Sequence, residues 1–153
     1  MDNIKELVFN NSLVCALSAW FIAQFIKVII AFFKTKRLNL LLLMSSGGMP
    51  SSHSSTVCAL ATSVGIHSGF TSAEFAIATI VAIVVMYDAA GIRRAAGEQA
   101  KVLNKMMDDL EKGDISDFDV QLKELLGHTP VEVLVGALLG ILIPIFAHFV
   151  LGI

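Results

Sequence analysis

Charged side chains are scarce in this chain. Asp, Glu, Lys and Arg make up 16% of its 153 residues, whereas 56% are hydrophobic. Soluble globular proteins average about 25% charged residues, so this sequence has too little polar surface to cover its apolar bulk in water. A mean hydropathy of +0.77 indicates the same. The composition excludes a disordered chain and argues strongly against a soluble one, so we expect the apolar residues to face lipid.

A basic surface and a cysteine framework are also lacking. The formal net charge is -2 and the pI is near 6.0, which gives no reason to expect a nucleic-acid partner, because nucleic-acid binders carry a basic footprint. Cys15 and Cys58 both lie inside apolar segments, so they indicate neither a secreted disulfide framework nor a zinc site. We expect two small buried apolar residues, and no metal or other cofactor is implied.

Long apolar runs are what the chain does contain. About 20 apolar residues suffice to cross a bilayer, and residues 12–33 contain a single charged residue, Lys27. Three further spans are expected at 54–68, 73–90 and 131–153. The predicted fold class is all-α, a single polytopic membrane domain over 1–153 with about four transmembrane helices and additional interfacial amphipathic helices. Segment 54–68 is short, which leaves a partly re-entrant course open.

Positive charge is concentrated in two of the connections. Loops 34–53 and 91–130 carry nine of the eleven Lys and Arg residues, and with four spans they lie on the same side of the membrane. The positive-inside rule places both loops in the cytoplasm. We therefore expect an integral protein of the plasma membrane or another inner membrane, with both termini outside.

The loop 91–130 is itself patterned. Apolar residues recur at helical spacing from Ala95 to Leu110, and a second short helix is expected with Ser116 as its N-cap. We expect both helices to lie in the membrane interface. The alternative is that they cover or build a site.

The most informative stretch is residues 47–56, Gly-Gly-Met-Pro-Ser-Ser-His-Ser-Ser-Thr. Gly47 and Gly48 allow the backbone to approach a ligand closely, and Ser51 or Ser52 can cap the helix that starts there. Free amides at a helix N-terminus beside serine hydroxyls form an anion site. His53, in the first turn, can bind a phosphate oxygen or protonate a leaving group. The alternative is a well-capped membrane helix with a histidine in the headgroup region.

A second histidine precedes the last expected span. Thr129 and Glu132 fit a capping box, with Pro130 at the first helical position, so Glu132 has a structural role in any case. His128 has no such explanation. His53 and His128 stand at two helix starts on one expected membrane face, where they can act as general acid and nucleophile in a displacement at phosphorus. Glu132 can then hold the imidazole of His128 in its useful tautomer.

Few cations are available to hold a phosphate. Arg93 and Arg94 can bind its oxygens through planar guanidinium groups, with positive-inside anchoring as the alternative. Lys27 lies within the first span, where an ionisable residue is a functional hypothesis by default and snorkelling is the alternative. Asp88 is the expected intramembrane partner of Lys27 or of an arginine.

These segments carry a family resemblance. Pro50-Ser51-Ser52-His53 resembles the P-S-G-H motif of the type 2 phosphatidic acid phosphatase and vanadium haloperoxidase superfamily, and residues 128–132 with Gly136 resemble its H-x-x-x-D motif. Together with residues 88–97, most of the chain is similar to the short, divergent membrane branch of that superfamily.

The resemblance implies a role for each residue. His128 would form a phosphohistidine, His53 would be the general acid, Glu132 would replace the orienting aspartate, and Ser52 with nearby amides would contact the phosphate. Two parts of the superfamily pattern are absent. The motif K-x6-R-P has no full match, and Gln121 and Leu122 stand where the third motif begins with S-R. Since a phosphoryl site needs cations around its developing charge, these must come from elsewhere in the chain.

The sequence therefore predicts a membrane phosphatase that hydrolyses a lipid or isoprenoid phosphate or diphosphate through a histidine nucleophile. The alternative is a non-catalytic membrane protein that binds an anionic lipid or phosphate, or a small transporter component. The missing arginine favours this alternative, and the paired histidines favour the enzyme. The small-residue faces of 54–68 also suit packing against a second copy of the chain, as a homo-oligomer.

Overall fold

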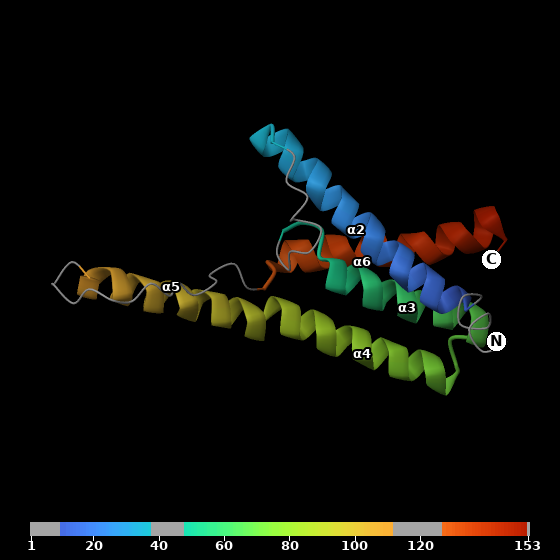
Figure 1. Ribbon diagram of the computed structural model, residues 1–153. Coiled ribbons are helices and arrows are strands. Elements are labelled where there is room, and N and C mark those ends of the chain that lie inside the picture. The colour runs from blue at the N-terminus through green and yellow to red at the C-terminus, as the bar shows by residue number, and fades with distance from the viewer. Residues whose placement is uncertain (1–9, 38–47, 112–126, 153) are drawn as a thin grey trace, which may run out of the picture.

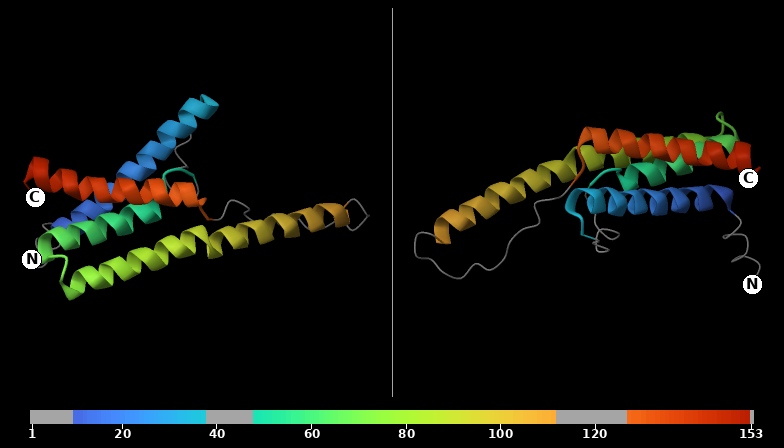
Figure 2. Two further views of the ribbon diagram at one scale, coloured as in Figure 1. Left: turned by 180° about the vertical axis from the view of Figure 1, so that it is seen from behind. Right: turned by 90° about the horizontal axis from the view of Figure 1, so that it is seen from above.

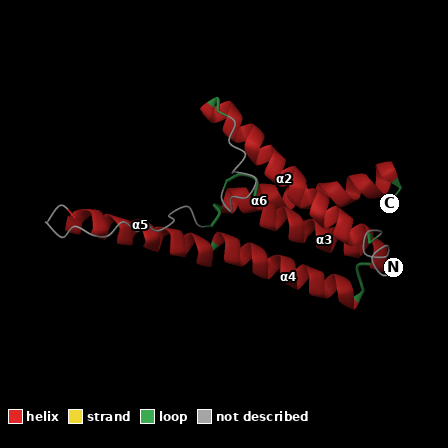
Figure 3. Ribbon diagram, in the orientation of Figure 1, coloured by secondary structure: helices red, strands yellow, loops and turns green. Residues whose placement is uncertain are grey.

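The computed structural model describes residues 10–37, 48–111 and 127–152, and helices account for nearly all of them (Figure 1). Four helices alternate in direction along the bundle: α2 (Asn11–Thr35), α3 (Ser52–Ser68), α4 (Ala73–Ala90) and α6 (Pro130–Phe146). A further helix, α5 (Ile92–Glu111), follows α4 and runs out beyond the bundle (Figure 2). The described residues contain no strand (Figure 3). The predicted all-α membrane bundle is thus confirmed.

Three helices of the described chain are long and apolar enough to cross a membrane: Asn11–Thr35, Ala73–Met107 and Pro130–Leu151. On α4, large apolar side chains such as Ile77 and Val84 are exposed, as expected for a surface that faces lipid. With 17 residues, α3 is about 25 Å long, slightly less than the ~30 Å hydrocarbon core. That α3 crosses the whole bilayer therefore stays a prediction.

The small residues of α3 explain its central place, between α2, α4 and α6 (Figure 2). Its serine hydroxyls bond to neighbours instead of water: Ser55 Oγ donates to the carbonyl of Ala19 at 3.2 Å, and Ser63 Oγ donates to Ser12 Oγ at 3.2 Å. Such bonds between helices are a common source of cohesion within a membrane. The small-residue faces of 54–68, which were expected to pack against a second copy, thus contact other helices of the same chain. Formation of a homo-oligomer stays a prediction.

The contact between α3 and α6 depends on two glycines one helical turn apart. A Cβ atom on Gly136 would lie 2.3 Å from the carbonyl oxygen of Ser51, and one on Gly140 would lie 2.3 Å from that of Ser55. The two backbones therefore touch, as small residues four apart allow in membrane helices. Further along, Pro144 lies inside α6, and a single π-helical turn, Ala147–Leu151, ends the helix.

Gly140→Ala is expected to destabilise the protein because its methyl group would meet backbone rather than a mobile side chain. Overpacking of this kind costs about 1–3 kcal/mol. Unfolding of the purified protein in detergent measures the change. Leu138→Ala is the matched control on the same helix, since Leu138 is exposed and should alter stability little. Equal stability of Gly140→Ala and the parent would contradict the close contact.

The ends of the helices determine which loops share a face. The C-terminal ends of α2 and α4 lie at the same end of the bundle as the N-terminal ends of α3 and α6 (Figure 1). Loops 34–53 and 91–130 therefore attach to one end, and both ends of the described chain lie at the other. The short helix expected after Ser116, and Gly47, lie outside the described residues.

Candidate functional site

Two helix N-termini meet at the end of the bundle where the motif loops attach. The side chain of Ser51 caps α3 by accepting from the amide of Ser54 at 3.3 Å. Thr129 caps α6 in the predicted capping box with Glu132. The two ends are joined directly, because the Ser51 amide donates to the Glu132 carbonyl at 3.0 Å. Since each N-terminus carries partial positive charge, their meeting point favours an anion.

His128 is held at this meeting point from two sides. Its Nδ1 lies 3.1 Å from Glu132 Oε2, the same oxygen that accepts from the Thr129 amide at 3.3 Å. Its own amide donates to the carbonyl of Ala89, in the last turn of α4, at 2.9 Å. A neutral imidazole that donates from Nδ1 to the carboxylate carries its lone pair on Nε2. Glu132 is thus both a helix cap and the hydrogen-bond partner that orients His128.

His53 stands in the first turn of α3, beside His128. The centres of the two rings are 6.0 Å apart, and their planes are inclined by 60°. The rings come from different helices and from positions 75 residues apart in the sequence. At this separation both imidazoles can contact one phosphate group, as a pair with complementary roles requires.

Lys27 brings a positive charge from α2. Its Nζ donates to Ser52 Oγ at 3.3 Å. Only 5% of the residue is exposed, so it does not snorkel to the surface. Asp88, which was expected to pair with Lys27 or with an arginine, lies half-buried in the last turn of α4.

The arginines and glycines are placed differently. Arg94 is exposed in the first turn of α5, and no hydrogen bond or ion pair within the described residues joins it to the histidines. Arg93 lies in the same turn, and its side chain is outside the described part of the structure. Gly48 has a φ of 88°, a left-handed conformation that favours glycine, three residues before Ser51, the N-cap of α3. The described geometry thus gathers Lys27 with the two serines, the two histidines and Glu132, while Arg94 is exposed.

A second polar cluster lies at the opposite end of the bundle. His67 Nδ1 lies 2.8 Å from the carbonyl of Ser63, and Asn11 Nδ2 lies 3.3 Å from His67 Nε2. The ring of His148 is 6.3 Å from that of His67. The bond between Asn11 and His67 ties α2 to α3. In the described part of the chain, no three His, Cys, Asp or Glu side chains are grouped so as to hold a metal ion.

Comparison with known proteins identifies the family of this chain. A profile described as the divergent PAP2 family matches residues 8–143. The chain belongs to the divergent PAP2 family. It is also 44% identical, over 155 aligned residues, to the uncharacterized membrane protein YuiD of Bacillus subtilis (strain 168), covering 94% of this chain and 98% of that protein. No solved structure matches. The resemblance inferred from the motifs is thereby confirmed, and the chain is a membrane protein of this divergent family.

Proposed function

We propose that this divergent PAP2 protein is a membrane phosphatase that hydrolyses a lipid or isoprenoid phosphate or diphosphate. The observation that carries the proposal is the hydrogen bond between His128 Nδ1 and Glu132 at the junction of two helix N-termini. It prepares Nε2 as a nucleophile, while the ring of His53 lies 6.0 Å away on another helix. A structural cap alone would explain Glu132, but it would not explain two histidines gathered beside a buried lysine.

The proposed reaction has two steps. In the first, Nε2 of His128 attacks phosphorus, the bond from phosphorus to the leaving oxygen breaks, and His53 protonates that oxygen. In the second, His53 takes a proton from water, which attacks the phosphohistidine and releases inorganic phosphate. Glu132 stabilises the positive charge on His128 in both steps. Lys27, Ser52 and the amides of the two helix ends hold the phosphate oxygens as negative charge develops.

Burial strengthens these electrostatic contributions. His128 is 2% exposed and Lys27 is 5% exposed, so charges at the site are weakly screened by water. A water-poor site also limits competing reactions. The same burial means that a substrate phosphate reaches Nε2 only when the side chains that cover it move aside.

A second candidate is a non-catalytic protein that binds phosphate or an anionic lipid, or a small transporter component. The exposed position of Arg94 favours it, because fewer cations then surround a reacting phosphate. Lys27, Ser52 and the two helix N-termini would bind an anion in the same place without reacting with it.

Phosphate release by the purified protein separates the two candidates. The substrates are lipid phosphates, isoprenoid phosphates and diphosphates presented in nanodiscs, and binding of inorganic phosphate is measured in parallel. Turnover that requires His128 supports the phosphatase. Binding of phosphate without turnover of any substrate would favour the second candidate.

The orientation of the site is part of the proposal, and we place the motif loops in the cytoplasm. Lys101→Cys on exposed α5 should be protected from a membrane-impermeant thiol reagent in intact cells and should react after lysis. Thr71→Cys, in the exposed turn between α3 and α4, is the matched control and should react in intact cells. The native Cys15 and Cys58 are buried and contribute little background. The reverse pattern of labelling would contradict the proposed topology.

A further inference from the structure

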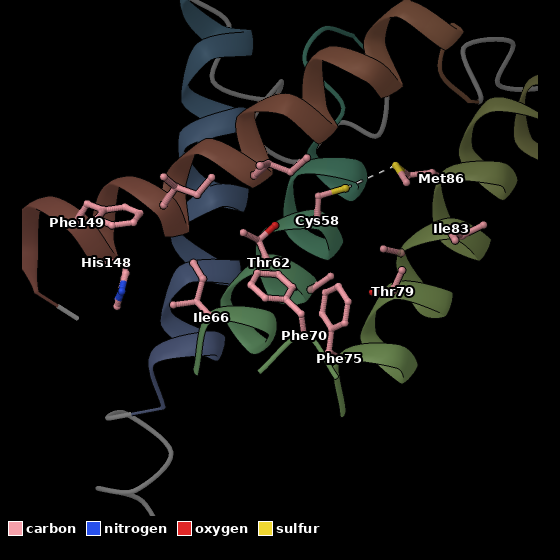
Figure 4. A pocket seen from close by; sticks show the side chains of 14 residues that line it. Cys58, Thr62, Ile66, Phe70, Phe75, Thr79, Ile83, Met86, His148 and Phe149 are labelled. Atoms are coloured by element: carbon pink, nitrogen blue, oxygen red, sulfur yellow. Dashed lines mark hydrogen bonds between the residues drawn. The ribbon is translucent and has the colours of Figure 1, made fainter. Parts of the chain in front are cut away.

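An apolar pocket of about 680 Å3 lies between α3, α4 and α6 (Figure 4). Its walls include Ile66 of α3, Ile83 of α4 and Ile141 of α6. Ile83 is 53% exposed, so the pocket is open at its α4 wall, on the surface that would face lipid. Its volume is in the range of pockets that hold one small ligand.

The two ends of this pocket differ. At the end nearer the histidines, the Cys58 thiol donates to Met86 Sδ at 3.6 Å, which links α3 to α4 (Figure 4). At the other end, the rings of Phe70 and Phe75 meet edge to face, with centroids 5.1 Å apart. The Phe70 ring packs closely on α3, because a Cβ atom on Gly65 would lie 2.6 Å from it. This aromatic pair closes the far end.

The pocket and the candidate site share one helix. Cys58 follows His53 by five residues, or about 8 Å along α3, and Ile66 lies about 12 Å further on. The whole path is about 20 Å, slightly longer than one leaflet of a ~30 Å hydrocarbon core. An amphiphile could place its anionic group in the candidate site at the start of α3 and its one hydrocarbon chain in the pocket along that helix.

We propose that this pocket holds the single hydrocarbon chain of a phosphorylated lipid, and that Phe70 and Phe75 limit the length of that chain. The inference rests on the proposed function, because the phosphate is placed at the histidines. A single chain is favoured because a second cavity, of about 390 Å3, is lined by α2 and the C-terminal part of the chain and by no residue of α3. A second chain in that cavity would not run along α3.

The pocket selects by shape rather than by hydrophobicity. The chain of a membrane lipid is already in an apolar medium, so its transfer from bilayer to pocket gains little. What the pocket provides is position, since a chain that fits along α3 holds the phosphate in reach of the histidines. A chain too long for the pocket meets the aromatic pair and draws the phosphate out of place.

Two tryptophan substitutions on α4 test the inference. Ile83→Trp places an indole in the pocket, whereas Ile80→Trp is the matched control, because Ile80 is 60% exposed on the same helix and does not line the pocket. The substrates, in nanodiscs, are alkyl monophosphates from butyl to octadecyl, with 4-nitrophenyl phosphate as the substrate that has no chain. Ile83→Trp should lower kcat/KM for the longer chains at least about tenfold, with 4-nitrophenyl phosphate unaffected. Phe70→Ala should move the preferred chain to a greater length.

The outcomes separate this inference from the proposed function. All three proteins, Ile83→Trp, Ile80→Trp and the parent, could hydrolyse 4-nitrophenyl phosphate and show identical chain-length profiles. That result would contradict chain binding in the pocket but would still support the phosphatase. Faster turnover of phosphatidic acid than of every single-chain substrate would overturn the single-chain assignment.

If neither the parent nor any variant turns over a substrate, the proposed function is wrong. A binding experiment then still tests the pocket. Hydrolysis-resistant alkyl phosphonates should raise the Tm of the parent and of Ile80→Trp most at the chain length that fits along α3, and less at shorter and longer lengths. In Ile83→Trp that dependence on chain length should be lost. If the Tm shift of Ile83→Trp still depends on chain length as in the parent, the proposal that the pocket binds the chain is contradicted.

Discussion

His128→Ala is expected to abolish turnover of every phosphate substrate, with kcat lowered by about 10⁴-fold or more. The variant removes Nε2, the atom that forms the bond to phosphorus, and leaves Lys27, Ser52 and the two helix N-termini in place. Affinity for inorganic phosphate should therefore persist, because these groups supply ground-state binding. Phosphate release, phosphate binding and Tm are measured on the same preparation.

His67→Ala is the control for this loss. His67 is also a histidine of α3, but it lies at the opposite end of the bundle, so turnover of 4-nitrophenyl phosphate should be close to that of the parent. Activity retained in His128→Ala would contradict the phosphohistidine mechanism and would favour the anion-binding alternative. If the Tm of His128→Ala falls so far that the variant is unfolded under the assay conditions, the lost activity would instead assign His128 a structural role.

His53→Ala should distinguish substrates by their leaving groups. A general acid contributes about 10²–10⁴-fold when the leaving oxygen needs a proton, so hydrolysis of alkyl phosphates should fall by that factor. The 4-nitrophenolate ion leaves without protonation, and that substrate should lose far less. The ratio of the two rates, compared between variant and parent, is the measurement.

The matched control is Ser54→Ala, a change one residue away in the same turn of α3. Ser54 Oγ donates to Ser51 Oγ at 3.0 Å, so its removal perturbs the start of the helix without removing an acid. It should change the two rates by the same factor. If His53→Ala slows the alkyl phosphate and 4-nitrophenyl phosphate by the same factor, His53 acts in structure or binding and not as a general acid.

The helices and their caps could be predicted from the sequence because their signals are local. Long apolar runs indicated the helices, and Thr129 with Glu132 formed the predicted capping box. The approach of His53 and His128 followed from one topological argument, since both residues stand at helix starts attached to loops expected on the same side. A ring separation of 6.0 Å agrees with it.

Contacts between distant segments could not be predicted in the same way. The bond from Lys27 to Ser52 joins residues 25 positions apart, and the only partner expected for Asp88 was Lys27 or an arginine. Arg93 or Arg94 was expected at the phosphate, and Arg94 is exposed in the first turn of α5, the helix that runs out beyond the bundle (Figure 2). The spacing of Gly136 and Gly140 was a readable signal of close helix packing, but the carbonyls they meet on α3 required the structure.

The close contact between α3 and α6 also bears on the site. Gly136 packs against the backbone of Ser51, whose amide bonds to Glu132. This contact sets the distance between the helix that carries His53 and the segment that carries His128. The geometry of the candidate site is therefore a consequence of backbone packing between two helices.

The central claim is that a covalent bond forms between His128 and phosphorus. Purified protein is mixed with a radiolabelled lipid phosphate, quenched in alkali because phosphohistidine is labile in acid, and digested for peptide mapping. We predict that the label is found on His128 of the parent and is absent from His128→Ala. Label on another residue, or steady turnover by the parent with no labelled peptide at any time of quenching, would contradict the account.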